Sequence, residues 1–174
     1  MKKWILLLPC TLFPYSLLIG LVCFLKGLGN VGEVFGFLPH LFLLSFACSI
    51  AFLILSISRK WDSEQICFCN MVVKAAQIPA YGLIFVLGLL SFSTLFTMGL
   101  SVFLLLFDLL SILLTGLIGV AGAARCRADG TISKRLAIWS GLLQFIFCID
   151  VISAVVLFIR AKSGSRRAGK RQSV

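Results

Sequence analysis

The sequence predicts an all-α, polytopic transmembrane helix bundle of about five spans. Hydrophobic residues make up 60% of its 174 residues and charged residues 13%, against roughly 45–50% and 25% in a soluble domain. The apolar residues gather into blocks of about 20 or more, the length that an α-helix needs to cross a bilayer. The ten-residue alternating segments typical of outer-membrane barrels are not found. These three observations define the fold class.

The apolar blocks give five spans, which we expect over residues 4–25 and 35–57, twice within 78–124, and over 136–159. The block at 78–124 is 47 residues long. As one helix it would extend about 70 Å at ~1.5 Å per residue, whereas the hydrocarbon core is ~30 Å thick. It therefore has to cross twice, and the small residues around Met98 and Gly99 place the break there.

The two ends of the chain are interpreted separately. The first apolar stretch exceeds 20 residues, which is longer than the ~7–15 residues of a signal peptide. We therefore expect an uncleaved first span, kinked or split by Pro9 and Pro14. Residues 1–160 then form one transmembrane helical bundle, and residues 161–174 form a basic, disordered tail.

The net charge of +10 comes from 16 Lys and Arg against 6 Asp and Glu. Because the basic residues lie between or beyond the spans, the charge indicates contact with anionic lipids and not with nucleic acid. We expect Lys74, just before the third span, to snorkel to the interface. With the N-terminus inside, nine basic residues lie inside and seven outside, which slightly favours an exported tail. The alternatives are an inverted orientation or one predicted span that is re-entrant.

Asp108 lies within the fourth span, where a charge costs on the order of 2.5–3.5 kcal/mol. Ser111, Thr115, Gly119 and Ala123 follow it at helical spacing and share one face of the helix. Small residues at such spacing allow another helix to approach closely. This face is therefore either a helix-packing surface containing a protonated Asp108, or the lining of a proton or cation site.

Asp150 lies at the middle of the fifth span. Gln144 stands on a different face of that helix, while Ser153 is close enough along the helix to share the face of Asp150. Asp108 and Asp150 have similar predicted depths in an antiparallel helix pair. We therefore expect that the two carboxyl groups could meet and share one proton.

Seven cysteines and one histidine complete the set of reactive side chains. Cys67 and Cys69 are spaced too closely for a structural zinc site, even with Cys126 on the same side of the membrane. His40 is expected at the interface, with a proton relay as the alternative. We find no P-loop, dinucleotide-binding turn or metalloprotease motif. No catalytic residue, metal or cofactor is therefore expected, and an enzyme is not favoured.

Three stretches carry a resemblance: residues 77–81, residues 107–119 with Phe107-Asp108-Leu109-Leu110, and residues 143–150 ending in Cys148-Ile149-Asp150. They resemble a family of small, uncharacterised integral membrane proteins of Firmicutes, over about residues 72–162. The resemblance implies a multi-pass protein of a bacterial plasma membrane. It implies no activity and no site.

Two function classes follow from these observations. The first is a non-enzymatic helical bundle that acts as an accessory, scaffold or immunity-type protein, as the small-residue faces indicate. The alternative is a channel or transporter for protons, ions or small solutes that uses Asp108 and Asp150. The expected partners are the lipid bilayer, including anionic lipids, and a homo-oligomer or larger membrane complex.

Overall fold

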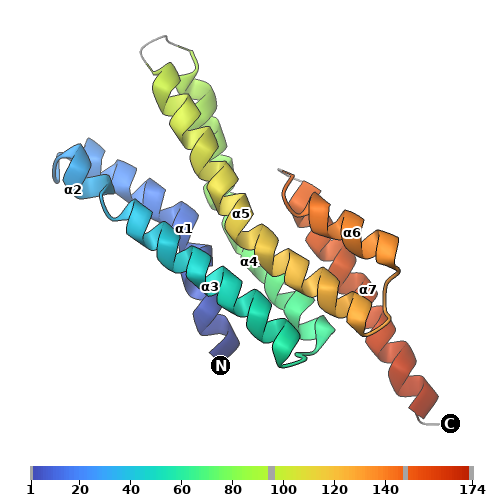
Figure 1. Ribbon diagram of the computed structural model, residues 1–174. Helices are drawn as coiled ribbons and strands as arrows, with labels where there is room; N and C mark the ends of the chain where they lie inside the picture. Colours follow the sequence, from blue (N-terminus) through green and yellow to red (C-terminus); the bar gives the residue numbers. More distant parts are fainter. Residues whose placement is uncertain (1, 94–96, 147–148, 173–174) are drawn as a thin grey trace.

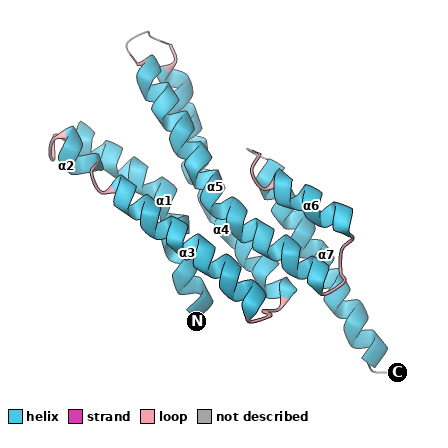
Figure 2. Ribbon diagram, in the orientation of Figure 1, coloured by secondary structure: helices cyan, strands magenta, loops and turns pink. Residues whose placement is uncertain are grey.

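The computed structural model describes residues 2–93, 97–146 and 149–172, and the side chains of residues 3–164 within these ranges. All regular structure in these ranges is helical (Figure 2), which confirms the predicted all-α class. The helices are α1 (Lys2–Leu25), α2 (Val31–Phe35), α3 (Leu38–Ser58), α4 (Ser63–Ser91), α5 (Met98–Ala128), α6 (Lys134–Leu143) and α7 (Ile149–Gln172).

Four helical segments of the described chain are long and apolar enough to cross a membrane: Lys3–Leu25, Val31–Ser58, Ser63–Ser91 and Met98–Ala128. They correspond to the first four expected spans. The expected break within residues 78–124 is confirmed, because α4 ends at Ser91 and α5 begins at Met98. The third span, however, begins fifteen residues earlier than the expected Ile78, at Ser63.

The early start of α4 has a local cause. Lys60 adopts a left-handed backbone conformation with φ of 47°, which turns the chain sharply after α3. Asp62 then caps α4, and its side chain accepts a hydrogen bond from the Glu64 amide at 3.4 Å. An Asp at this position satisfies an amide that the first turn of a helix leaves unpaired.

The two prolines do not split α1, which is continuous from Lys2 to Leu25. Proline has no N–H, so Pro14 leaves the carbonyl of Cys10 without its helical partner. The Gln77 side chain on α4 donates to that carbonyl at 2.7 Å. Tyr15 on α1 in turn donates to the carbonyl of Ala76 on α4. The proline therefore creates a polar contact that joins α1 to α4.

The fifth expected span is not a single crossing, and this is the main correction to the expected fold. Helix α6 has ten residues and ends at Leu143; the chain then turns, and α7 runs back beside α6 (Figure 1). Ser153 donates to the carbonyl of Ser140 at 3.2 Å, although thirteen residues separate them. In a continuous helix that separation would be about 20 Å. The segment is therefore a re-entrant hairpin, one of the alternatives that the charge distribution raised.

The hairpin returns the chain to the end of the bundle at which α6 begins (Figure 1). At this end Lys3 donates to Gln65 at 2.6 Å, and Arg125 donates to the carbonyl of Trp61 at 2.9 Å. Gly164 on α7 packs so closely on Thr131 that an added Cβ would lie 2.4 Å from its methyl group. The end of α7 and the N-terminus therefore lie at the same end, contrary to the expected exported tail. Residues 161–172, expected to be disordered, continue α7.

Candidate functional site

One face of α4 is polar and completely enclosed by other helices. Asn70, Lys74, Gln77 and Tyr81 follow one another at intervals of four, three and four residues, which places them on one side of a helix. All four side chains are buried. Polar groups at this depth have to find partners within the protein, because the hydrocarbon core offers none.

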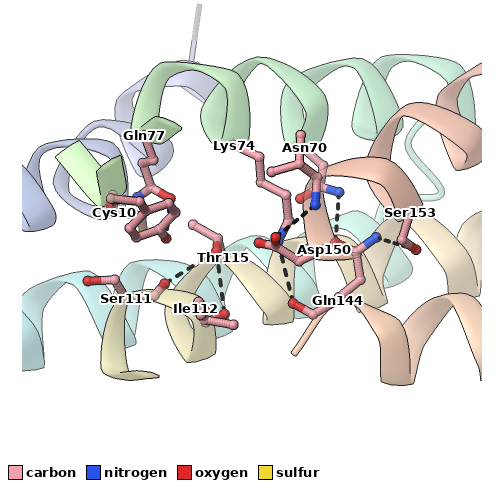
Figure 3. Close-up of polar contacts among 12 residues, drawn as sticks. Cys10, Asn70, Lys74, Gln77, Ser111, Ile112, Thr115, Gln144, Asp150 and Ser153 are labelled. Carbon is pink, nitrogen blue, oxygen red and sulfur yellow. Dashed lines mark hydrogen bonds and ion pairs between the residues drawn. The ribbon is translucent and has the colours of Figure 1, made fainter. Parts of the chain in front are cut away.

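Lys74 finds its main partner in Asp150. Its Nζ lies 2.7 Å from Oδ2 of Asp150 and 3.4 Å from the carbonyl oxygen of Gln144. The other carboxylate oxygen of Asp150 accepts from the amide of Val151 at 2.8 Å. The side chains of Lys74 and Asp150 are 0% and 3% exposed. Figure 3 shows Lys74 directed into the gap between Asp150 and Gln144. The pair is thus a fully buried salt bridge.

The pair occupies the break between α6 and α7, where the helix ends favour its charges. Gln144 is the C-terminal cap of α6, and Asp150 is in the first turn of α7. Helix C-termini carry partial negative charge and N-termini partial positive charge. The Lys74 ammonium therefore lies at the end that attracts cations, and the Asp150 carboxylate lies at the end that attracts anions.

Gln144 links the remaining polar groups to the ion pair. Its side-chain oxygen accepts from Asn70 at 3.3 Å, and its side-chain nitrogen donates to Ser153 at 3.3 Å. Ser153 donates onward to the carbonyl of Ser140. The structure thus brings together the predicted residues Gln144, Asp150 and Ser153. We call these three, with Asn70, Lys74 and Ser140, the buried polar network.

The small residues of α5 make room for this network. A Cβ on Gly119 would lie 2.3 Å from Cδ of Gln144, and one on Gly116 would lie 2.5 Å from the ring of Phe145. Ala123 is buried further along, in a cluster that includes Leu157 of α7. The face that begins at Ser111 thus receives the turn between α6 and α7, since only residues without bulky side chains permit this approach.

Ser111 and Thr115 are fully buried but bond within their own helix. Ser111 donates to the carbonyl of Phe107 at 3.0 Å, and Thr115 to those of Ser111 and Ile112 at 3.3 and 3.4 Å. Back-bonding to the preceding turn is a common way for Ser and Thr to satisfy themselves in a helix. These contacts do not join the two residues to the ion pair (Figure 3).

Asp108 stands apart from the network. It is 6% exposed and borders a pocket of about 240 Å³ between α4 and α5. Its Oδ1 is buried and has no hydrogen-bond partner in the described structure. The expected proton-sharing pair of Asp108 and Asp150 does not form, because Lys74 occupies Asp150.

Sequence reasoning missed Asn70, Lys74 and Gln77, and it placed Lys74 wrongly at the interface. The expected span began at Ile78, so all three residues fell outside it. Their spacing along the sequence was nevertheless a signal, because polar residues at i, i+4 and i+7 mark one face of a helix. If the expected span had begun next to Asp62, this polar face would have fallen within it.

The cysteines and the histidine form no metal site among the described residues, since no group of three or more His, Cys, Asp or Glu side chains is close enough. Cys67 and Cys126 are both buried, with their Sγ atoms 3.4 Å apart. His40 is exposed, and its Nδ1 lies 3.2 Å from the carbonyl of Gly36. This exposed position fits the expected interfacial role.

The fold and the network define a class: an all-helical bundle with four segments able to cross a membrane and a re-entrant hairpin closed by a buried ion pair. Comparison with protein-family models, curated proteins and solved structures finds no match to this chain. The resemblance to small membrane proteins of Firmicutes therefore stays a prediction.

Proposed function

We propose that this chain is a non-enzymatic, non-conducting membrane bundle that serves as an accessory, scaffold or immunity-type protein. The observation that carries the proposal is the Lys74–Asp150 ion pair. An ionisable residue within a membrane is by default a candidate for transport. Here the carboxylate already binds an ammonium group and a backbone amide, at 2.7 and 2.8 Å. A group held in this way supports a structural role.

The surroundings of the pair support the same role. Gln144 and Ser153 use their side chains within the network, and Gly119 brings α5 into direct contact with Gln144. A pocket of about 290 Å³ borders Asp150, but its other walls are mainly apolar, with Ile78 and Phe85 among them. A conducting path needs a chain of polar sites that exchange partners. In the network Lys74, Asp150, Gln144 and Ser153 each have hydrogen-bond partners, and Oδ1 of Asn70 has none among the described residues.

We place the protein in a bacterial plasma membrane with both termini in the cytoplasm. Of its 16 Lys and Arg, Lys26 alone belongs to the far end and Lys74 is internal, which leaves 14 at the end that holds both termini. The positive-inside rule assigns that end to the cytoplasm. Such a concentration of positive charge also favours contact with anionic lipids of the inner leaflet.

The second candidate is a conductor of protons, ions or small solutes. It depends on Asp108, whose Oδ1 has no partner and which borders a pocket. A carboxyl group that is not committed to a partner is free to take up and release a cation.

Flux measurements in proteoliposomes separate the two candidates. We expect the purified chain to give no proton or potassium flux above protein-free liposomes under an imposed gradient. Flux in the natural chain would overturn the proposal in favour of conduction, and its loss in a folded Asp108→Asn protein would assign the conduction to Asp108. A double variant, Lys74→Met with Asp150→Leu, shows whether such flux needs the ion pair.

A further inference from the structure

The pocket beside Asp108 has the form of a small ligand site. It lies between α4 and α5, and its volume of about 240 Å³ is just below the 300–1,000 Å³ typical of drug-sized ligands. Its walls are apolar and include Ile84, Phe85 and Leu104. Ser101 also lines the pocket, but its hydroxyl donates to the carbonyl of Gly88 at 2.8 Å. Among the described residues, Oδ1 of Asp108 is therefore a polar side-chain atom of this lining without a partner.

The carboxyl group of Asp108 lacks the donor that a buried acceptor requires. The residue is 6% exposed, and its Oδ1 has no hydrogen bond within the described structure. Buried polar atoms without partners are uncommon in native proteins, and each requires an explanation. Lys74, the basic residue buried in the bundle, is already bound to Asp150. A donor from outside the chain would satisfy Asp108.

The pocket opens to the outside of the bundle and not to its centre. Phe85, Leu89 and Leu105 at its rim are 51%, 58% and 60% exposed. Asp108 is ten residues beyond Met98, the first residue of α5, which is about 15 Å along the helix axis. A ligand would therefore enter from the acyl-chain region, and it has to be soluble in lipid.

We infer that this pocket binds a small lipophilic amine, whose ammonium group pairs with Asp108 and whose hydrocarbon part fills the apolar cavity. An ammonium group supplies charge-assisted hydrogen bonds to the carboxylate. A metal ion is not suited to the site, because Ca²⁺ and Mg²⁺ need about six or more oxygen ligands. A neutral hydrocarbon would fill the volume but would offer no donor to the carboxyl group of Asp108. The inference does not depend on whether the protein conducts ions.

The inference is tested by equilibrium binding to the full chain in lipid nanodiscs. The probe is 3-(4-fluorophenyl)propylamine, and its neutral counterpart is 3-(4-fluorophenyl)propan-1-ol. Titrations followed by fluorine NMR are corrected with protein-free nanodiscs. We expect saturable amine binding and alcohol binding at least tenfold weaker. We also expect Asp108→Asn to remove the advantage of the amine. Equal affinity for the two probes, an unchanged preference in Asp108→Asn, or no saturable amine binding would each overturn the inference.

A second variant tests the location of the site without altering its charge. Gly88 lines the pocket, and a Cβ added to it would meet no atom within 4 Å. Gly88→Leu should therefore fold and fill the pocket, with a loss of amine affinity of at least tenfold. Gly82 borders the other pocket, beside Asp150, and is equally open. Gly82→Leu is thus the matched control and should bind as the natural chain does. A Gly88→Leu protein that folds and keeps its affinity would refute this location.

Discussion

The ammonium group of Lys74 lies 2.7 Å from the carboxylate of Asp150, and the two residues are 76 positions apart in the sequence. The pair joins the middle of α4 to the first turn of α7, at the break that separates α7 from α6. A continuous helix would hold its backbone groups in its own hydrogen bonds. The break exposes the carbonyl of Gln144 to Lys74 and the amide of Val151 to Asp150. The re-entrant hairpin and the ion pair therefore require each other.

Removing one charge of this pair should be strongly destabilising. In Lys74→Met or Asp150→Asn, we expect the free energy of unfolding to fall by about 3–5 kcal/mol, because the other partner stays buried and uncompensated. In the double variant Lys74→Met/Asp150→Leu most of the loss should be regained, since neither charge is then buried. Detergent-induced unfolding, followed by tryptophan fluorescence, measures all three.

The matched control for the ion pair is Arg125 with Asp129, a partly exposed pair at 2.8 Å whose side chains are 11% and 32% exposed. Exposed salt bridges contribute about 0–1 kcal/mol, so Asp129→Asn should have little effect on unfolding. A similar small effect for Asp150→Asn would contradict a stabilising role for the buried pair.

Gly119 should not tolerate even a methyl group. In Gly119→Ala the new Cβ would lie 2.3 Å from Cδ of Gln144, so Gln144 would have to leave the network. We expect a loss of about 1–3 kcal/mol in the free energy of unfolding, as in other overpacked interiors. Gly82→Ala should instead be neutral or stabilising, because its Cβ meets no atom within 4 Å and alanine favours a helix. Equal effects of the two substitutions would argue against close packing at Gly119.

The re-entrant hairpin predicts where the two ends of the chain lie. A fluorescent reporter fused after Val174 should fold in the cytoplasm, and a periplasmic phosphatase at the same position should be inactive. The reverse should hold for reporters inserted after Ser93, between α4 and α5. Phosphatase activity at both positions would show that the tail crosses the membrane, against the observed hairpin.

Cys67 and Cys126 should form a disulfide under oxidation, because their Sγ atoms are 3.4 Å apart. Treatment with copper phenanthroline should remove the hydrogens of both thiols and join α4 to α5. After denaturation, alkylation and mass spectrometry should find two fewer free thiols and one cross-linked peptide. Cys126→Ser should abolish the cross-link, whereas Cys69→Ser should not. An unchanged thiol count in the oxidised natural chain would contradict the observed proximity.

Hydropathy predicted the four segments that are long and apolar enough to cross a membrane, because bilayer thickness imposes a length on such helices. The break near Met98 was also predictable, since an apolar block of twice that length has to turn. The start of α4 was not, because Lys74 and its polar neighbours lower the local hydropathy. Because of this lower hydropathy, the third span was expected to begin only at Ile78, and the polar face of α4 was left out of it.

The re-entrant hairpin could not be read from residues 136–159, which form one apolar run with a helical pattern. What breaks the helix is a partner from a distant element: Lys74 binds the carbonyl of Gln144 and the side chain of Asp150. The candidate residues Gln144, Asp150 and Ser153 were chosen because they are polar. On a continuous helix Gln144 and Asp150 lie on different faces, and only the reversal of the chain brings the three together. A tertiary interaction here overrides local periodicity.

The sequence separation of the ion pair has a consequence for biosynthesis. The ribosome completes Lys74 76 residues before it completes Asp150, so Lys74 has no carboxylate partner when α4 is first synthesised. The nascent chain cannot reach its final state until the C-terminal hairpin has been made and inserted. The contact between α4 and α7 therefore forms only after α7 has been synthesised.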